Sequence, residues 1–253
     1  MKFYDLSKEQ RQRLVQTITN DITADIKAGD ISHVRKYASD TDTYIRKNTY
    51  LVISRIYKNN ETLREKIIGL LDSLYKNSDE KIRQTVAYTL GEIGKVDAGA
   101  VLGLLEIALH DEHHKVKNGV IGALKQMCEK NPQPTLAFAS RLINHDDPKV
   151  RREIIHGIEL HGRAHPEDVL PLLRQVQNDK SKLVTKMVIH VIGQISYKKG
   201  CLAKVIAELK AWDNRELVEK ALEEIIEVHK SYAKFSALTV AEAKAYIRAN
   251  FEL

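Results

Sequence analysis

One register recurs along this chain about every 34 residues. Each copy has an aliphatic residue, here called the anchor, and the first five copies place a base or Thr directly after it. The anchors are Ile45, Ile82, Val116, Val150, Val184 and Val218. Successive anchors are 37, 34, 34, 34 and 34 residues apart. Such regular spacing is typical of a stacked repeat array, in which each unit buries its apolar face against its neighbours.

The segment after each anchor is predicted to be an α-helix, the second helix of a pair. Apolar residues follow the anchor at helical spacing, and the alternation of a strand is absent. Five copies have an Asp or Asn five positions before the anchor, and the fourth has His145 there. These five residues are Asp40, Asn77, Asp111, Asp179 and Asp213. We expect them to cap the first free backbone N–H groups of the helices.

Shorter amphipathic segments between these helices are predicted to form the first helix of each pair. They cover residues 61–76, 97–109, 134–144, 166–177 and 201–212. A further helix is expected from Ser7 to Ala28 and a last one from Val240 to Phe251. The chain is therefore predicted to be all-α, an α-solenoid of about six helix pairs with a helical cap at both ends.

No Gly/Ser-rich, Pro-rich or low-complexity stretch marks a domain boundary. We therefore expect one domain over residues 1–253, with an N-terminal cap (1–29), repeats (30–230) and a C-terminal cap (231–253). Cys128 and Cys201 lie far apart in the sequence without ligand spacing, so neither a disulfide nor a zinc site is expected. The polar start of the chain lacks the apolar core of a secretory signal, and no apolar run reaches the ~20 residues that span a bilayer. These features predict a cytoplasmic protein without a membrane partner.

Two second-helix segments carry a family resemblance. IRQTVAYTLGEIG, from Ile82 to Gly94, and DDPKVRREI, from Asp146 to Ile154, resemble the HEAT-repeat (armadillo-like) family, whose consensus second helix has an Asp, a Val-Arg pair, then Ala and Leu-Gly. The resemblance covers roughly residues 30 to 230 and implies the fold. It leaves function open, because such arrays serve as transport receptors, phosphatase scaffolds, lyases and DNA-binding proteins. The tetratricopeptide repeat shares the period, but its Trp, Gly-Tyr and Pro landmarks are missing.

A narrower resemblance is to bacterial HEAT-like DNA-alkylation-repair proteins, which hold duplex DNA in a basic concave face. IKAGDISHVRKYASDTDTYIRKN, from Ile26 to Asn48, and LKAWDNRELVEKALEEI, from Leu209 to Ile225, are similar to them in general character. In members that excise a base, the resemblance implies a concave cluster of tryptophans with an Asp and an Arg. Here the only tryptophan is Trp212, at the end of a predicted first helix.

The base that follows the anchor has two interpretations. It recurs as Arg46, Arg83, Lys117 and Arg151. These side chains contact phosphates, or they pair with the Asp of the adjacent copy and form a ladder between repeats. We favour the ladder, because a partly buried base requires a partner and an Asp is present in nearly every copy.

The column two positions after the anchor is predicted to face solvent on the concave side. It reads Lys47, Gln84, Asn118, Arg152, Lys186 and Lys220. Since the chain has a net charge of +6 and a pI near 9.1, a polyanionic partner is compatible with its composition. The candidate binding residues for nucleic acid or an acidic partner are Lys47, Arg151, Arg152, Lys186 and Lys220. Acids on the same face would repel a polyanion and limit the contact to a weak or local one; they are Glu153, Glu159, Glu223, Glu224 and Glu227.

A metal site was considered at His156 and His190, which share one register position, with Glu224 in the next copy. A stable site needs at least three converging ligands, and Glu224 is expected two helix spacings from His156. No metal and no cofactor are therefore expected. The histidines of the DEHHK run, Asp111 to Lys115, are interpreted as an exposed turn.

The sequence contains no GxSxG, GxxxxGK[ST] or GxGxxG motif and no acid pair at catalytic spacing. Our first hypothesis is a non-catalytic binding module whose basic groove takes nucleic-acid (DNA) backbone. The second is a protein–protein interaction scaffold for an acidic partner, and the third is a glycosylase of the DNA-alkylation-repair type. Trp212, Tyr88 and Tyr197 would stack on bases or pack between helices, and packing is the preferred interpretation.

Overall fold

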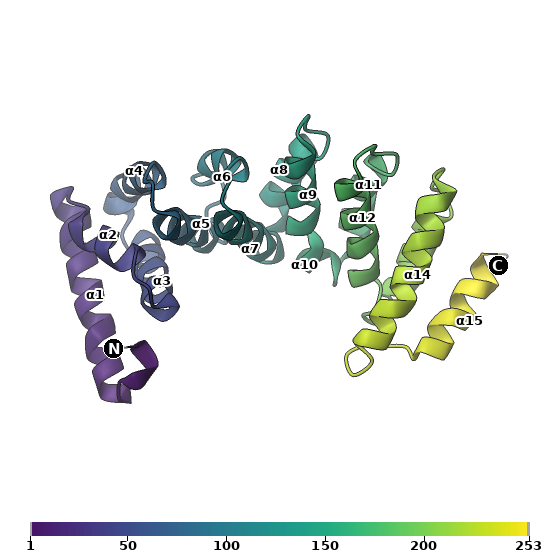
Figure 1. Ribbon diagram of the computed structural model, residues 1–253, viewed down its shortest axis with the longest axis horizontal. Coiled ribbons are helices and arrows are strands. Elements are labelled where there is room, and N and C mark those ends of the chain that lie inside the picture. Colours follow the sequence, from purple (N-terminus) through teal and green to yellow (C-terminus); the bar gives the residue numbers. More distant parts are fainter. Residues whose placement is uncertain (1, 252–253) are drawn as a thin grey trace. The chain divides into compact units, whose positions relative to one another are not determined.

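The computed structural model describes residues 2–251, within which every regular element is helical (Figure 1). Met1 and residues 252–253, at the outer ends of the two expected caps, lie outside this range. The chain divides into two compact units, one up to Asn131 and one from Pro132 onward. The prediction of an all-α helical array is confirmed, whereas the prediction of a single domain stays a prediction.

In the first unit, long and short helices alternate along the chain. Its elements are η1 (Phe3–Asp5), α1 (Lys8–Ala28), α2 (Ser32–Ala38), α3 (Thr43–Asn59), η2 (Glu61–Leu63), α4 (Arg64–Tyr75), α5 (Glu80–Gly94), α6 (Leu102–Leu109) and α7 (His114–Lys130). The second helices α3, α5 and α7 pack in series, and α4 and α6 pack on α5 and α7 as the first helices of their pairs. The expected N-terminal helix is α1, which begins after the capping box of Ser7 and Gln10.

The second unit repeats this arrangement. Its elements are α8 (Pro132–Leu142), α9 (Pro148–Gly157), α10 (Glu159–Gly162), α11 (Pro166–Gln175), α12 (Lys182–Gln194), α13 (Cys201–Leu209), α14 (Arg215–Ser231) and α15 (Val240–Asn250). The second helices α9, α12 and α14 lie side by side, with α12 between the other two (Figure 1). The second helix of the fourth copy ends at Gly157, and the short α10 begins at Glu159. The helix is therefore interrupted at Ile158 in this copy, which the register does not predict.

The anchors lie in the seams between helices. Ile82, Val116, Val150, Val184 and Val218 are at most 2% exposed, while Ile45 is half-buried in the first copy. Each buried aliphatic side chain contributes about 1.5–3 kcal/mol to folding. The equivalence of the copies, inferred from spacing alone, is thereby supported in three dimensions.

Four of the five expected helix caps were assigned two residues too early, and Asp213 was assigned one residue too early, since Asn214 is the N-cap of α14. Asp79, not Asn77, is the N-cap of α5, and its carboxylate accepts a hydrogen bond from the N–H of Lys81. Asn77 accepts a hydrogen bond from the N–H of Asp79 instead. An Asp or Asn side chain accepts a hydrogen bond from the backbone N–H two residues further along the chain. A residue five positions before the anchor therefore stabilises the turn that precedes the helix, and the helix is capped by a later residue. The same offset recurs at Asp40, Asp111, His145 and Asp179.

The isolated aromatic and sulfur side chains belong to the core. Trp212 is fully buried, and its Nε1 donates to Glu208 at 3.4 Å. Tyr197 is buried and stacks on Tyr232 with 5.3 Å between ring centroids. Cys128 and Cys201 are buried and are not joined in a disulfide. Packing, the preferred interpretation for Trp212 and Tyr197, is thus confirmed.

Candidate functional site

The base after the anchor forms the predicted ladder between copies at Arg83 and Arg151, two of the four predicted positions. Arg83 Nε lies 2.7 Å from Asp111 Oδ2, and Arg83 Nη1 donates to the carbonyls of Asn77 and Ser78 in its own turn. Tyr75 also donates to Asp111 through its hydroxyl, at 2.9 Å. One arginine therefore joins the turns of two consecutive copies, and the ladder interpretation is confirmed at this position.

Arg151 repeats the same contacts in the second unit. Its Nε and Nη2 lie 2.6 and 2.8 Å from the two carboxylate oxygens of Asp179, and its Nη1 donates to the carbonyls of His145 and Asp146. The pair is mostly buried. Burial favours a raised pKa for Asp179, but the hydrogen bonds from Arg151 and from the Ser181 N–H hold this pKa below its ordinary value. Arg151 is therefore the least accessible of the candidate binding residues.

The other candidates of the second unit occupy one register position on three adjacent helices: Arg152 on α9, Lys186 on α12 and Lys220 on α14. Arg152 Nη1 lies 2.7 Å from the buried Glu153 carboxylate, and Lys220 Nζ lies 2.5 Å from Glu216. Lys186 is exposed and makes no hydrogen bond or ion pair with the described residues. Only Lys186 of this column has its full charge available to a partner.

Lys47 belongs to the first unit, where it lines a pocket of about 330 Å³ with three tyrosines. Tyr50 and Tyr88 face each other at 5.3 Å between ring centroids, and the ring of Tyr44 is 44% exposed. Burial raises the pKa of Tyr50 to about 12, so its hydroxyl stays neutral. The pocket combines a free ammonium group with aromatic surface, two features that nucleic-acid-binding surfaces use together.

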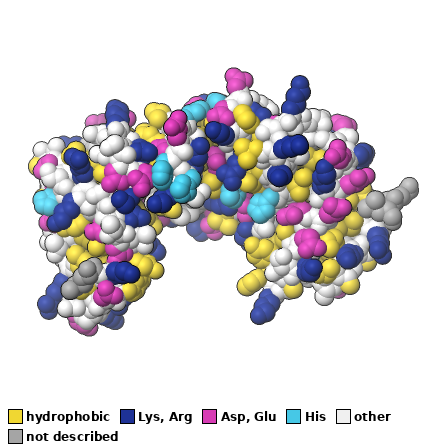
Figure 2. All heavy atoms as spheres, in the orientation of Figure 1, with side chains coloured by type: hydrophobic (Ala, Val, Ile, Leu, Met, Phe, Trp, Pro, Cys, Tyr) yellow, Lys and Arg dark blue, Asp and Glu magenta, His cyan; other side chains and the backbone are white. Residues whose placement is uncertain are grey.

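Acids and bases alternate over the surface of the two units. On the face drawn in Figure 2, Lys and Arg side chains are interspersed with Asp and Glu. The acids that were expected to dilute the basic column include Glu153 and Glu159, both of which are buried. Their charges act on nearby side chains more than on solvent.

Two histidines and Glu159 converge in the second unit. The Nε2 atoms of His156 and His190 lie 3.3 and 3.7 Å from the Oε2 atom of Glu159. Ligand atoms of all three residues lie within 4.8 Å of one another, which is close enough to hold a metal ion. Glu224, which was considered as a third ligand and expected to lie too far from His156, is 3.7 Å from His190 Nδ1. The acid that faces both histidines is Glu159, which the repeat register did not indicate as a ligand.

From the sequence, Glu159 was expected only to repel a polyanion on the concave face. The signal that could have found it is its spacing from His156, since residues three apart share one face of a helix. Glu159 lies at the start of α10, directly after the break that ends α9. The repeat register predicts each second helix as one continuous helix and does not predict this break.

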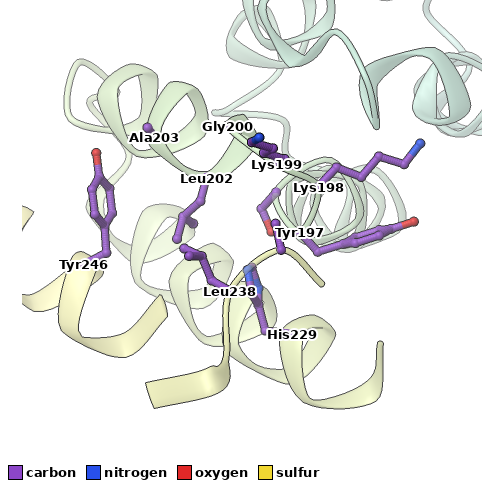
Figure 3. Close-up of a pocket in the computed structure, with 11 residues that line it drawn as sticks. Tyr197, Lys198, Lys199, Gly200, Leu202, Ala203, His229, Leu238 and Tyr246 are labelled. Carbon is purple, nitrogen blue, oxygen red and sulfur yellow. The ribbon is translucent and has the colours of Figure 1, made fainter. Parts of the chain in front are cut away.

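An apolar pocket of about 610 Å³ lies where the α12–α13 loop faces α14 and α15. Figure 3 shows Leu202, Leu238 and Tyr246 on one side of it and His229 beside Tyr197 on the other. The Nδ1 atom of His229 is 2.8 Å from the carbonyl oxygen of Ile225. Burial lowers the pKa of His229, although the hydrogen bond to this carbonyl opposes the effect. The pocket is therefore lined mainly by apolar groups, with Lys198 and Lys199 in the loop beside it, and fits an apolar substituent.

No helix within residues 2–251 combines the length and the apolar character needed to cross a membrane. Paired helices stacked on buried anchors, with an arginine ladder between turns, define an α-solenoid of the HEAT type. Residues 135–227 match the family described as HEAT repeats, which confirms the resemblance inferred from the sequence. Residues 25–106 match the family described as non-SMC mitotic condensation complex subunit 1.

Two solved structures from Streptococcus mutans share the fold. AlkD2 is 20% identical, with a TM-score of 0.57 over 84% of this chain and 100% of that chain. The protein smu.31, from strain UA159, is 18% identical, with a TM-score of 0.55 over 74% of this chain and 97% of that chain. No curated protein matches the sequence. At these identities the structural similarity describes the fold alone.

Proposed function

We propose that this protein is a non-catalytic HEAT-type binding module that holds nucleic-acid backbone on its second helices. The observation that carries the proposal is the column of Arg152, Lys186 and Lys220, which places one basic side chain on each of three adjacent helices. Packed helices lie about 8–10 Å apart, and duplex DNA carries one charge per ~1.7 Å of its axis. Each basic side chain of such a column can therefore contact a phosphate of one duplex.

Lys47 extends the proposal to the first unit. Its ammonium group is exposed, and Tyr44 provides aromatic surface in the same pocket. Nucleic acid would use both features if a phosphate contacts Lys47 while a nucleobase or sugar packs against the tyrosines. Arg151 contributes mainly by holding its turn in place, because Asp179 already engages its guanidinium group.

Duplex binding by the Lys186→Glu variant tests the proposal. Fluorescence anisotropy with 30-base-pair duplexes at low salt should show weaker binding than wild type for every sequence alike, because phosphate contacts carry no sequence information. The affinity of the wild type should fall with salt on a log–log slope of several units. Lys244→Glu is the matched control, since Lys244 is exposed on α15, outside the column. Equal losses in the two variants, or no binding by the wild type, would remove the proposal.

The second candidate is a scaffold for an acidic protein segment. It is favoured by the same basic column, in which Lys186 is exposed and could pair with the carboxylates of such a segment. Pull-down from lysate before and after nuclease treatment separates the candidates. Partners that survive nuclease and are lost in Lys186→Glu support the scaffold.

The third candidate, an alkylated-base glycosylase, stands on the narrower resemblance. Trp212 is fully buried in the core, so the chain's only tryptophan is not available to stack on a base. Release of methylated purine from alkylated DNA would support this candidate. Its absence at high protein concentration would remove it.

A further inference from the structure

We infer that His156, Glu159 and His190 form a binding site for a divalent transition-metal ion, with Zn²⁺ the best match to these ligands. Two imidazoles and one carboxylate are a ligand set that zinc takes in proteins. The three residues come from α9, α10 and α12, so the site exists only when consecutive copies of the second unit are packed together.

The distances suit a tetrahedral ion. Bonds of about 2.0–2.1 Å at tetrahedral angles place neighbouring ligand atoms roughly 3.4 Å apart. Glu159 Oε2 is 3.3 Å from His156 Nε2 and 3.7 Å from His190 Nε2. The remaining pair, formed by the two histidines, lies within 4.8 Å, and the half-exposed side chain of His190 has room to move toward His156.

Groups around the three ligands hold the carboxylate in a metal-binding orientation. Arg163 Nη2 lies 2.5 Å from Glu159 Oε1 and 2.8 Å from the side-chain oxygen of Gln194. One carboxylate oxygen is thus engaged, and the other, Oε2, points to the histidines. Outer partners of this kind fix ligand geometry in metal sites.

Glu224 is placed to orient His190. A Cβ atom on Gly193 would lie 2.6 Å from the Glu224 Cγ atom, so the absence of a side chain at Gly193 lets Glu224 pack against α12. Its carboxylate lies 3.7 Å from His190 Nδ1, the ring nitrogen that faces away from Glu159. A carboxylate behind a metal-binding histidine favours the tautomer whose Nε2 is free to bind the ion.

Glu159 is buried, so its charge needs cationic neighbours. A cation bound at Oε2 would supply such charge beside the oxygen that faces the two histidines.

The site is open to solvent on the side of His190, whose side chain is 41% exposed. Three protein ligands leave a fourth position for water, the arrangement of catalytic and not of closed structural zinc sites. An ion can therefore enter and exchange in the folded protein.

Zinc titration of the tag-free, chelator-treated full-length protein tests the inference. Isothermal titration with ZnCl₂ should show one ion per chain with a dissociation constant in the micromolar range or lower. Because losing an outer partner already weakens metal binding by about 10–100-fold, His156→Ala and His190→Ala should each weaken it by at least about 100-fold. Co²⁺ should give the visible absorption bands of a tetrahedral site in the wild type only.

His165→Ala is the matched control, since His165 is exposed in the same unit and lies outside the cluster. Substitution of the buried Glu159 would disturb the core, whereas His190 is half-exposed and its substitution leaves the core intact. No zinc binding at high micromolar concentration would overturn the inference. So would binding that persists in His190→Ala, or that is lost on replacing His113 and His114.

Discussion

Arg83 and Arg151 each join two consecutive copies through one carboxylate. Each guanidinium group reaches the carbonyls of its own turn with Nη1 and the Asp of the next copy with Nε and Nη2. Arg46 binds only the carbonyls of its own turn, because Asn77 replaces the acid in the following copy. The ladder therefore depends on an acid at this one position of the next copy.

We expect Arg151→Ala to lower the free energy of unfolding by about 2–4 kcal/mol, because Asp179 would remain buried without its charged partner. Urea denaturation followed by circular dichroism measures the change. Arg215→Ala, an exposed position on α14, is the control and should lie within about 0.5 kcal/mol of wild type. A double variant that also carries Asp179→Ala should recover part of the loss. Equal effects at Arg151 and Arg215 would contradict the ladder.

His229 should make stability depend on pH. Its pKa is lowered from 6.5 by burial in the folded protein, so the unfolded chain binds a proton at a higher pH than the folded chain does. Stability therefore falls as pH decreases from about 6.5 toward the folded pKa. His229→Gln should reduce the difference between melting temperatures at pH 7.5 and pH 5.5. The same pH dependence in both proteins would show that His229 takes no part.

The second helices α5 and α7 approach each other closely where glycine faces alanine. A Cβ atom on Gly91 of α5 would lie 2.7 Å from the Ala123 Cα atom of α7 and 2.8 Å from its Cβ atom. Backbone atoms cannot move aside as a flexible side chain can. The spacing of α5 and α7 therefore depends on the missing side chain at Gly91.

Gly91→Ala should destabilise the first unit by about 1–3 kcal/mol through overpacking. Gly69→Ala is a matched control, because Gly69 lies in α4 with no atom within 4 Å of an added Cβ. That substitution should stabilise by about 0.5–1 kcal/mol through helix propensity. Thermal unfolding of both variants gives the comparison. If both changes stabilise, α5 and α7 are not in the close contact described.

Helices were easier to predict than their ends. The segment 61–76 corresponds to η2 and α4, but the segment expected over 97–109 is helical only from Leu102. Asp97 accepts hydrogen bonds from the Ala100 N–H and the Tyr57 hydroxyl, which keeps the residues before Leu102 in a turn. Apolar spacing reports which residues are buried, whereas a helix end depends on single hydrogen bonds that spacing does not describe.

The chain forms two compact units, and its only tryptophan reports on the second of them. If residues 1–253 unfold as the one domain predicted, the fluorescence of Trp212 and the far-ultraviolet circular dichroism should give the same unfolding midpoint. Gly91→Ala, a change in the first unit, should then shift both signals together. A fluorescence midpoint that stays in place while the circular dichroism shifts would show two independent units.

The proposed binding column was predicted from residue type and register, and its residues do occupy equivalent positions on adjacent helices. Their availability was not predictable in the same way. Arg151 and Arg152 are engaged by Asp179 and Glu153, whereas Lys186 is free among the described residues. Whether a surface base is neutralised depends on which acids the fold places beside it.

The 34-residue spacing was sufficient to predict helix pairs and buried anchors, because each copy must cover the same apolar stripe with its neighbour. The ladder was predicted from the base and the Asp that recur in the copies, and it is present at Arg83 and Arg151. Tertiary structure decided the cluster of His156, Glu159 and His190. It requires the break between α9 and α10 and the packing of α12 beside them. A metal site depends on distances of a few ångströms between side chains from different elements, and such distances are set only when the helices are in place.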